Sequence, residues 1–292
     1  YAYERGRLLL ALEHRVRFTA HKPEAATEPD EGMTEGTALV TGASEGIGYE
    51  LTTIFAENGY DVVMVARSED RMKEIADELG EDFGVSAQVI KKDLSVPGSS
   101  EEVYEEAPEV DVLVNNAGIG TCGFFHENDV WREVDTARLN VETPTHLTRL
   151  FLEDMVERDE GRILNVSSMA AFQPGPTMAV YYATKAYLLS FSEAISNEVK
   201  DTDVSVTALC PGPTETAFIQ KAGEQNSRIN EGEKMSQRTV AEAGYEGLMN
   251  EKRVVVPGFK NRMLVRLTKI APKSLVIRVA RYLQEPTSGE KA

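Results

Sequence analysis

After Thr37 the chain alternates between short apolar runs rich in β-branched residues and longer stretches in which apolar residues recur at helical spacing. Such alternation is typical of βα units packed around a parallel sheet. The pattern therefore predicts an α/β protein with a doubly wound, seven-stranded parallel sheet and helices on both faces. We place the strands near residues 37–42, 60–66, 86–92, 110–115, 161–167, 203–209 and 253–257.

The first predicted helix shows the periodicity. Ile47, Leu51 and Ile54 lie on one helical face, and Gly59 marks the end of the helix before the next strand. Residues 217–237, by contrast, are polar and without periodicity, so we predict a loop there, of the kind that often covers a binding site.

The C-terminal part of the chain has a different, basic amphipathic pattern. Arg262, Arg266, Lys269 and Lys273 recur at intervals of three and four residues, and apolar side chains occupy the adjoining faces. Pro272 separates this helix from a second amphipathic stretch. Neither stretch is long enough to span a membrane.

These patterns divide the chain into three parts. Residues 1–32 lack strand patterning and precede Met33, a natural start, so we expect an extension without a catalytic role. Residues 33–258 contain every predicted strand and form the main domain. Residues 259–292 form a basic amphipathic helical extension.

The net charge of the whole chain is −17, from 48 acidic and 31 basic residues. This balance argues against nucleic acid as a partner, because phosphate binding needs a basic field. A soluble acidic surface explains the charge, and adaptation to high salt is the alternative. Full activity and stability without added salt would contradict that alternative.

Residues 252–281 carry nine basic and no acidic side chains, which leaves −26 on the rest of the chain. One interpretation is a lid or an oligomer-contact helix whose cations pair with the protein's own acidic surface. The other is docking on an anionic lipid surface or an acyl carrier.

The two cysteines, Cys122 and Cys210, form no disulfide framework and have no metal-ligand spacing. We therefore expect no metal site and a reducing, cytoplasmic compartment, with peripheral membrane association as the alternative location. The longest apolar runs fall short of the roughly 20 residues that cross a bilayer.

Two short motifs suggest chemistry. TGASEGIG, from Thr41 to Gly48, joins the first strand to the first helix, where glycines let backbone N–H groups approach a pyrophosphate. YYATK ends at Lys185, and residues four apart share a helical face, so Lys185 lies beside Tyr181 while Tyr182 points elsewhere. A nearby cation is what a tyrosine needs to act in proton transfer near neutral pH.

Five motifs in order resemble the classical short-chain dehydrogenase/reductase family over about residues 37–257: TGASEGIG, NNAG at 115–118, the serine pair at 167–168, YYATK and PGPTET at 211–216. The resemblance implies a Rossmann-like catalytic domain. It also implies hydride transfer between a nicotinamide cofactor and a carbonyl or secondary alcohol. We expect a homo-dimer or homo-tetramer.

The resemblance further implies a catalytic tetrad. Ser168, thirteen residues before Tyr181, orients the carbonyl oxygen, and alternation along a strand lets only one of the two neighbouring serines face the substrate. Tyr181 donates the proton, Lys185 lowers the pKa of the tyrosine and binds ribose, and Asn140 holds a water of the proton relay. We predict that Tyr181→Phe abolishes NADPH-dependent reduction and that Tyr182→Phe leaves most of it.

For the cofactor, Arg67 follows the second strand where NAD-binding relatives carry a carboxylate, so the resemblance implies NADP(H) over NAD(H). Glu45 disagrees, because NADP-preferring relatives often carry Lys or Arg there. Asp93 matches an adenine-binding residue or caps the next segment, and Asn115 matches a residue that mainly braces the sheet. The implied cofactor-binding residues are Gly42, Ser44, Gly46, Ile47, Gly48, Arg67, Asp93, Asn115, Ala117, Gly118, Tyr181, Lys185, Pro211, Gly212, Thr214 and Thr216.

Two other functions compete. A catalytically silent NADP-binding regulatory protein is disfavoured by the intact tetrad, and a nucleotide-sugar epimerase or dehydratase by the glycine spacing and the chain length. The substrate is not specified by the sequence. Five apolar residues near the motifs indicate an apolar pocket: Phe124, Phe125, Phe172, Met178 and Phe218. Packing in the protein core is the alternative explanation, and it accounts for most apolar residues.

Overall fold

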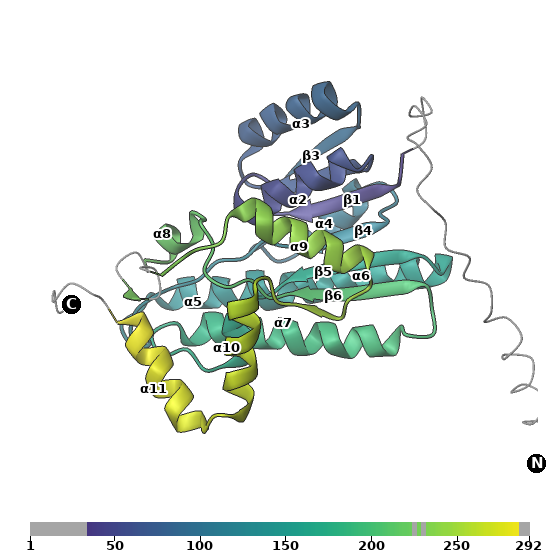
Figure 1. Ribbon diagram of the computed structural model, residues 1–292. Coiled ribbons are helices and arrows are strands. Elements are labelled where there is room, and N and C mark those ends of the chain that lie inside the picture. Colours follow the sequence, from purple (N-terminus) through teal and green to yellow (C-terminus); the bar gives the residue numbers. More distant parts are fainter. Residues whose placement is uncertain (1–33, 224–226, 229–231, 286–292) are drawn as a thin grey trace, which may run out of the picture. The chain divides into compact units, whose positions relative to one another are not determined.

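The computed structural model of the protein describes residues 34–223, 227–228 and 232–285 (Figure 1). These residues belong to one compact unit that begins at Thr34. The predicted role of residues 1–32 lies outside the described residues.

A seven-stranded parallel sheet with the strand order β3-β2-β1-β4-β5-β6-β7 forms the centre of this unit. All seven predicted strands are confirmed, with ends that shift by up to two residues. The strands are β1 (Thr37–Thr41), β2 (Asp61–Ala66), β3 (Ala87–Lys91), β4 (Val112–Asn115), β5 (Gly161–Val166), β6 (Val204–Leu209) and β7 (Val254–Val255).

Helices cover both faces of the sheet, as predicted (Figure 1). On one face, α2, α3 and α9 pack into a core that contains Phe55, whose ring meets Tyr60 and Tyr245 edge-on at 5.4 and 5.3 Å. Side chains of α4, α6 and α7 fill the core on the other face. The helices are α2 (Gly46–Glu57), α3 (Glu69–Phe83), α4 (Ser99–Glu106), α5 (Val130–Ala137), α6 (Thr143–Arg158), α7 (Ala179–Glu198), α8 (Phe218–Ala222), α9 (Gln237–Met249), α10 (Phe259–Ile270) and α11 (Lys273–Gln284).

The prediction of a loop over residues 217–237 is wrong in one respect, because α8 lies within it. A five-residue helix is too short to be stable alone, and contacts with distant segments hold it. The Ala222 carbonyl accepts a 2.9 Å hydrogen bond from the Cys122 N–H, and Lys221 forms an ion pair with Glu45.

β1 lies between β2 and β4, so the chain switches direction across the sheet at β1. Crevices at such switch points, beside the carboxyl ends of the strands, are the usual ligand sites of open α/β sheets. Here the two flanking loops are joined by Thr41, whose hydroxyl accepts 3.0 Å hydrogen bonds from the N–H groups of Asn116 and Ala117. The fold therefore brings the TGASEGIG and NNAG motifs together.

Candidate functional site

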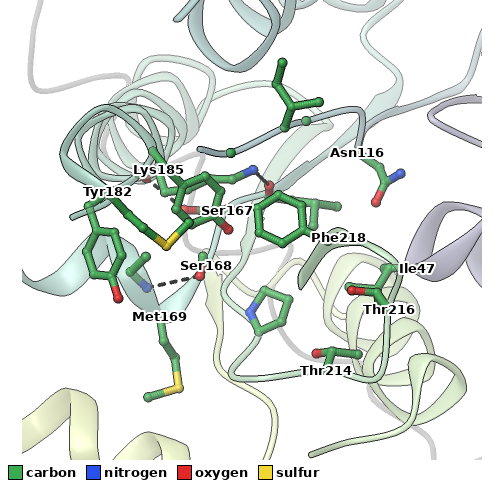
Figure 2. A pocket seen from close by; sticks show the side chains of 18 of the residues that line it. Ile47, Asn116, Ser167, Ser168, Met169, Tyr182, Lys185, Thr214, Thr216 and Phe218 are labelled. Carbon is green, nitrogen blue, oxygen red and sulfur yellow. Dashed lines mark hydrogen bonds between the residues drawn. The ribbon is translucent and has the colours of Figure 1, made fainter. Parts of the chain in front are cut away.

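A cavity of about 980 Å³ opens at the carboxyl ends of the central strands. Its lining comes from the glycine-rich loop, the segments after β4, β5 and β6, the start of α7, and helices α8, α10 and α11; Figure 2 shows part of it. The cavity brings together most of the predicted site residues: Gly42, Ser44, Gly46, Ile47, Arg67, Asp93, Ala117, Gly118, Ser168, Tyr181, Lys185, Pro211, Gly212, Thr214 and Thr216.

Two predicted cofactor residues lie behind the described lining instead. Gly48 packs under the loop, where an added Cβ would overlap the Gly42 carbonyl oxygen. The buried amide of Asn115 donates to Asn165 Oδ1 at 2.9 Å and to Thr148 Oγ1 at 3.1 Å. The structure thus gives Asn115 a bracing position between β4 and β5, away from the cavity.

Asn140 is also enclosed, in a π-helical turn (Arg138–Glu142) between α5 and α6. Its amide exchanges two hydrogen bonds with the backbone of Ile119, at 3.0 and 2.9 Å. Asn140 Nδ2 also donates to Thr184 Oγ1 at 3.0 Å, and Thr184 donates to the Tyr181 carbonyl at 2.7 Å. Asn140 therefore links the loop after β4 to the turn of α7 that carries the predicted catalytic residues.

Lys185 lines the cavity and is buried. Its ammonium donates a 2.8 Å hydrogen bond to the Val166 carbonyl and lies 5.8 Å from the centre of the Tyr181 ring. Burial disfavours the charged form and lowers the pKa of Lys185 to about 8. The cation thus lies beside Tyr181, in the arrangement that their spacing predicts.

The two neighbouring serines face different partners (Figure 2). The Ser167 hydroxyl is buried and donates to the Lys185 carbonyl at 2.9 Å, which ties the end of β5 to α7. The less buried Ser168 heads a 3₁₀ turn (Met169–Phe172), where its hydroxyl accepts a 3.1 Å hydrogen bond from the Ala170 N–H. Both serines belong to the cavity lining, so alternation along the strand does not separate them as predicted. Because the Ser167 hydroxyl is already bonded to α7, Ser168 is the better placed of the two for a ligand.

The adjacent tyrosines also differ in their surroundings. The Tyr181 ring lies 5.1 Å from the Phe218 ring of α8, so this helix packs over the predicted proton donor. Tyr182 packs against Gly175, and its hydroxyl accepts a 2.7 Å hydrogen bond from Gln284 Nε2 of α11. The hydroxyl of Tyr182 thus has a structural partner.

The other end of the cavity suits an anionic dinucleotide. In the described structure α2 begins at Gly46 without a side-chain cap, so its first N–H groups are available to an anion. Gly46 has a φ of 64°, and an added Cβ there would lie in van der Waals contact with Thr216, at 3.7 Å. The Arg67 side chain is 71% exposed, 3.8 Å from the Asp93 carboxylate.

Asp93 also fills its alternative role. Its carboxylate accepts hydrogen bonds from the N–H and the hydroxyl of Ser95, at 3.0 and 2.7 Å. The side chain therefore shapes the turn after β3 while it lines the cavity. The two roles weighed for Asp93 are compatible.

Sequence reasoning missed several residues of the site. Asn116 lines the cavity, and its amide donates to the carbonyls of Thr41 and Gly42, at 2.9 and 3.2 Å. Asn116 is the second asparagine of the NNAG motif, and its place in that motif could have identified it as a site residue. The ion pair of Glu45 with Lys221 of α8 had no signal, because the two residues are 176 positions apart.

The apolar part of the lining was predicted in part. Phe172, Met178 and Phe218 line the cavity, but Phe124 and Phe125 are exposed and do not belong to its described lining. An apolar wall on α10 and α11 replaces them. That wall comprises Leu264, Leu267, Leu275, Val276, Val279 and Leu283.

The described residues contain neither a membrane-spanning helix nor a cluster of metal ligands. None of the helices in this part of the chain is long and apolar enough to span a membrane. In the same residues, His, Cys, Asp and Glu side chains form no group of three or more that could hold a metal ion.

Known proteins resemble this chain in sequence and in fold. A short chain dehydrogenase of Pseudocercospora fijiensis is 36% identical over 203 residues, which are 66% of this chain and 65% of that protein. A very-long-chain 3-oxoacyl-CoA reductase of Anas platyrhynchos is 34% identical over 184 residues, 60% of this chain and 58% of the relative. The chain thus matches less than two thirds of the length of either relative.

Among solved structures, a short-chain dehydrogenase from Sphingobium yanoikuyae in complex with NADPH is 27% identical, with a TM-score of 0.72. The similarity covers 82% of this chain and 97% of that one. The short chain dehydrogenase family matches residues 36–227, well over half of the chain. The protein therefore belongs to the short-chain dehydrogenase family of oxidoreductases.

Proposed function

We propose that this protein is an NADP(H)-dependent oxidoreductase that interconverts a carbonyl and a secondary alcohol on an apolar substrate. The observation that carries the proposal is the single cavity in which the glycine-rich loop and Arg67 share a space with Ser168, Tyr181 and Lys185. Membership of an oxidoreductase family supports the same reaction class.

The cofactor would be held by the glycine-rich loop and the start of α2, whose N–H groups suit a pyrophosphate. A nicotinamide cofactor bound there supplies or accepts the hydride. The exposed guanidinium of Arg67 suits a ribose 2′-phosphate, which it can bind through charge-assisted hydrogen bonds. The NADPH complex of the Sphingobium relative supports this preference.

In reduction, the Tyr181 hydroxyl donates the proton to the carbonyl oxygen, which the Ser168 hydroxyl orients. Lys185 supports this step, because a cation beside the ring favours the phenolate that remains. Asn140 contributes from behind the cavity wall, through its contacts with Ile119 and Thr184, to proton resupply. These roles account for all four residues of the predicted tetrad.

The test is NADPH oxidation with a panel of ketones, aldehydes and acyl compounds, followed by absorbance. Tyr181→Phe should lower kcat by about a thousandfold, within the range of general acid–base contributions. The matched control is Tyr187→Phe on the same helix, because Tyr187 lies on the outer side, bonded to Thr145 at 2.8 Å. Equal losses in the two variants would contradict the assignment.

The competing function is that of a silent NADP-binding regulator, for which we expect cofactor binding without turnover. Such a protein would bind NADPH, measured by nucleotide fluorescence, but would turn over none of the panel. The tetrad geometry favours turnover, because the Lys185 ammonium is held beside Tyr181.

Peripheral contact with an anionic membrane forms a further part of the proposal. Phe259, Met263 and Ile270 are exposed on α10, which also carries the cation Arg266, and α11 begins with the cation Lys273. Among the described residues, neither cation forms an ion pair within 4.0 Å. Two other cations of these helices do pair with acidic side chains of the protein, Lys260 with Glu233 and Arg281 with Glu285, so the self-pairing interpretation holds for part of the basic segment. Apolar side chains mixed with free cations suit a lipid interface.

Sedimentation with phosphatidylglycerol vesicles tests this contact. Arg266→Gln with Lys273→Gln should reduce the bound fraction at low salt. A control with the same charge change, Lys200→Gln with Arg149→Gln, alters exposed residues after α7 and on α6, outside the basic segment. Equal binding of both variants would exclude the contact. The homo-dimer or homo-tetramer stays a prediction. Analytical ultracentrifugation, which measures the mass of the assembly in solution, tests it.

A further inference from the structure

Helices α10 and α11 form one wall of the cavity, although both follow the region that matches the family, which ends at residue 227 (Figure 1). The wall lines the same cavity as Tyr181, and α11 ends at Gln284, which is bonded to the neighbouring Tyr182.

The cavity side of these helices is mainly apolar, with Asn261 and Thr268 as its polar members. Leu264, Leu267, Leu275 and Val279 line the cavity, yet each is between 48% and 52% exposed. A bound ligand can cover side chains that line a cavity and remain half exposed. Because these side chains are apolar, an apolar ligand gains the most free energy by burying them. A carbonyl group alone is too small to cover residues on two helices.

Gln284 fixes this wall to the catalytic helix. It is nearly completely buried, donates to the Tyr182 hydroxyl at 2.7 Å and accepts from the Thr177 hydroxyl at 3.1 Å. Thr177 has a φ of 71°, a conformation that β-branched residues rarely adopt, and its carbonyl accepts a 2.8 Å hydrogen bond from the Gly123 N–H. The end of α11 is thereby joined to the segment that leads into α7.

We propose that α10 and α11 form a subsite for an extended apolar tail of the substrate, and that Gln284 is the positioning residue that holds this subsite against Tyr181. The proposal rests on the proposed function and narrows its substrate class to carbonyl compounds with a long apolar tail. The tail lies along Leu264, Leu267, Leu275 and Val279, while the carbonyl lies at Ser168 and Tyr181.

A series of straight-chain methyl ketones, from butanone to dodecanone, tests the subsite. The wild type should show kcat/KM that rises with chain length. Val279→Trp fills the subsite and should reduce kcat/KM for dodecanone by about tenfold or more, while butanone changes by less than about twofold. The matched control is Ile277→Trp on the same helix, because Ile277 is not part of the described cavity lining. Equal length dependence in wild type and Val279→Trp overturns the proposal.

Leu275→Asn serves as a second variant if Val279→Trp fails to fold. It removes apolar surface from the same wall without adding bulk, and thermal unfolding establishes that it is folded. The gain in kcat/KM with chain length should shrink in this variant too. An unchanged gain overturns the proposal.

A binding measurement separates this proposal from the proposed function. The probe is cis-parinaric acid, whose fluorescence rises in apolar sites, added to the full chain without cofactor. Weaker binding to Val279→Trp than to Ile277→Trp supports the subsite even if no ketone is reduced, in which case the proposed function alone fails. Equal binding to both variants counts against the subsite whatever the turnover.

Gln284→Leu tests the positioning role, since it removes both hydrogen bonds and keeps a similar volume. KM for dodecanone should rise severalfold while kcat for butanone changes little, and amide exchange across residues 273–284 should accelerate. Ser274→Ala, in the first turn of the same helix, is the control. A Gln284→Leu variant with lower thermal stability and an unchanged length preference would show a merely structural role and overturn the assignment.

Discussion

The ammonium of Lys185 and the carbonyl of Val166 form a 2.8 Å hydrogen bond inside the protein, and one neutral acceptor leaves the buried charge poorly compensated. Burial accordingly lowers the pKa of Lys185 from an ordinary value of 10.5 to about 8. The residue that the proposed chemistry needs as a cation is thus held where its charge is disfavoured.

Lys185→Met should therefore stabilise the cofactor-free protein at pH 7 while it abolishes reduction. Below pH 8 the lysine is protonated in the folded and unfolded states, so the buried charge costs stability there. Between pH 8 and 10.5 the unfolded state binds more protons, and the stability of the wild type rises with pH. The advantage of the variant should shrink across that window.

Thermal unfolding from pH 7 to 10, with the cofactor absent, measures this difference. Lys200→Met provides the control, because Lys200 is exposed. A midpoint for Lys185→Met at or below that of the wild type at pH 7 would mean that the Val166 hydrogen bond compensates the charge.

Arg67→Ala should separate the two nicotinamide cofactors. The loss of a charge-assisted contact to a 2′-phosphate costs about 1.5–3 kcal/mol, so KM for NADPH should rise by about tenfold or more. KM for NADH should change by less than about twofold, because NADH has no such phosphate. Steady-state kinetics with both cofactors decides, and a parallel rise in both KM values would assign Arg67 to a shape-forming role with Asp93.

Asn115 and Asn116 form a matched pair of neighbours with different expected effects. Asn115→Ala leaves Asn165 Oδ1 in the core without this donor and should lower the free energy of unfolding by about 2 kcal/mol, with KM for NADPH nearly unchanged. Asn116→Ala releases the Gly42 carbonyl and should raise KM for NADPH more than it lowers stability. Urea unfolding and cofactor titration measure the two effects, and an exchange of the effects would contradict both positions.

The sheet was predictable because a parallel sheet covered on both faces requires nearly continuous apolar strands, as in DVVMVA from Asp61 to Ala66. The side-by-side placement of Tyr181 and Lys185 followed from helical periodicity. The bracing position of Asn115 was implied by the family resemblance of NNAG, and the strand pattern alone would not have given it, because neighbouring residues at a strand end point to opposite sides. Which of them meets a ligand depends on the flanking layers.

Features fixed by long-range contacts escaped prediction. Gln284 and Tyr182 are 102 residues apart, and the amphipathic pattern of α11 does not specify a buried amide at its end. The five residues of α8 carry too little periodicity to predict a helix, which forms because Ala222 and Lys221 have partners elsewhere. Pairing of this kind depends on the completed fold.

The contact between Glu45 and Lys221 yields the last prediction. It joins the glycine-rich loop to α8, which covers Tyr181, and both side chains are more than half exposed. An exposed ion pair contributes only about 0–1 kcal/mol to stability, so Glu45→Gln should barely change the unfolding midpoint. It should, however, loosen α8 and raise KM for the substrate severalfold at low ionic strength.

Salt provides the sharper measurement, because about 1 M salt screens an exposed pair. KM of the wild type should rise with ionic strength toward the value for Glu45→Gln, whereas KM of the variant should stay constant. Lys73→Gln, which breaks an exposed pair with Glu69 on α3, is the control and should behave as the wild type. Salt weakens the attraction between the two exposed charges and leaves the apolar packing in place. A wild-type KM that is insensitive to ionic strength would therefore mean that the packing of Phe218 on Tyr181, and not the ion pair, holds α8 in place.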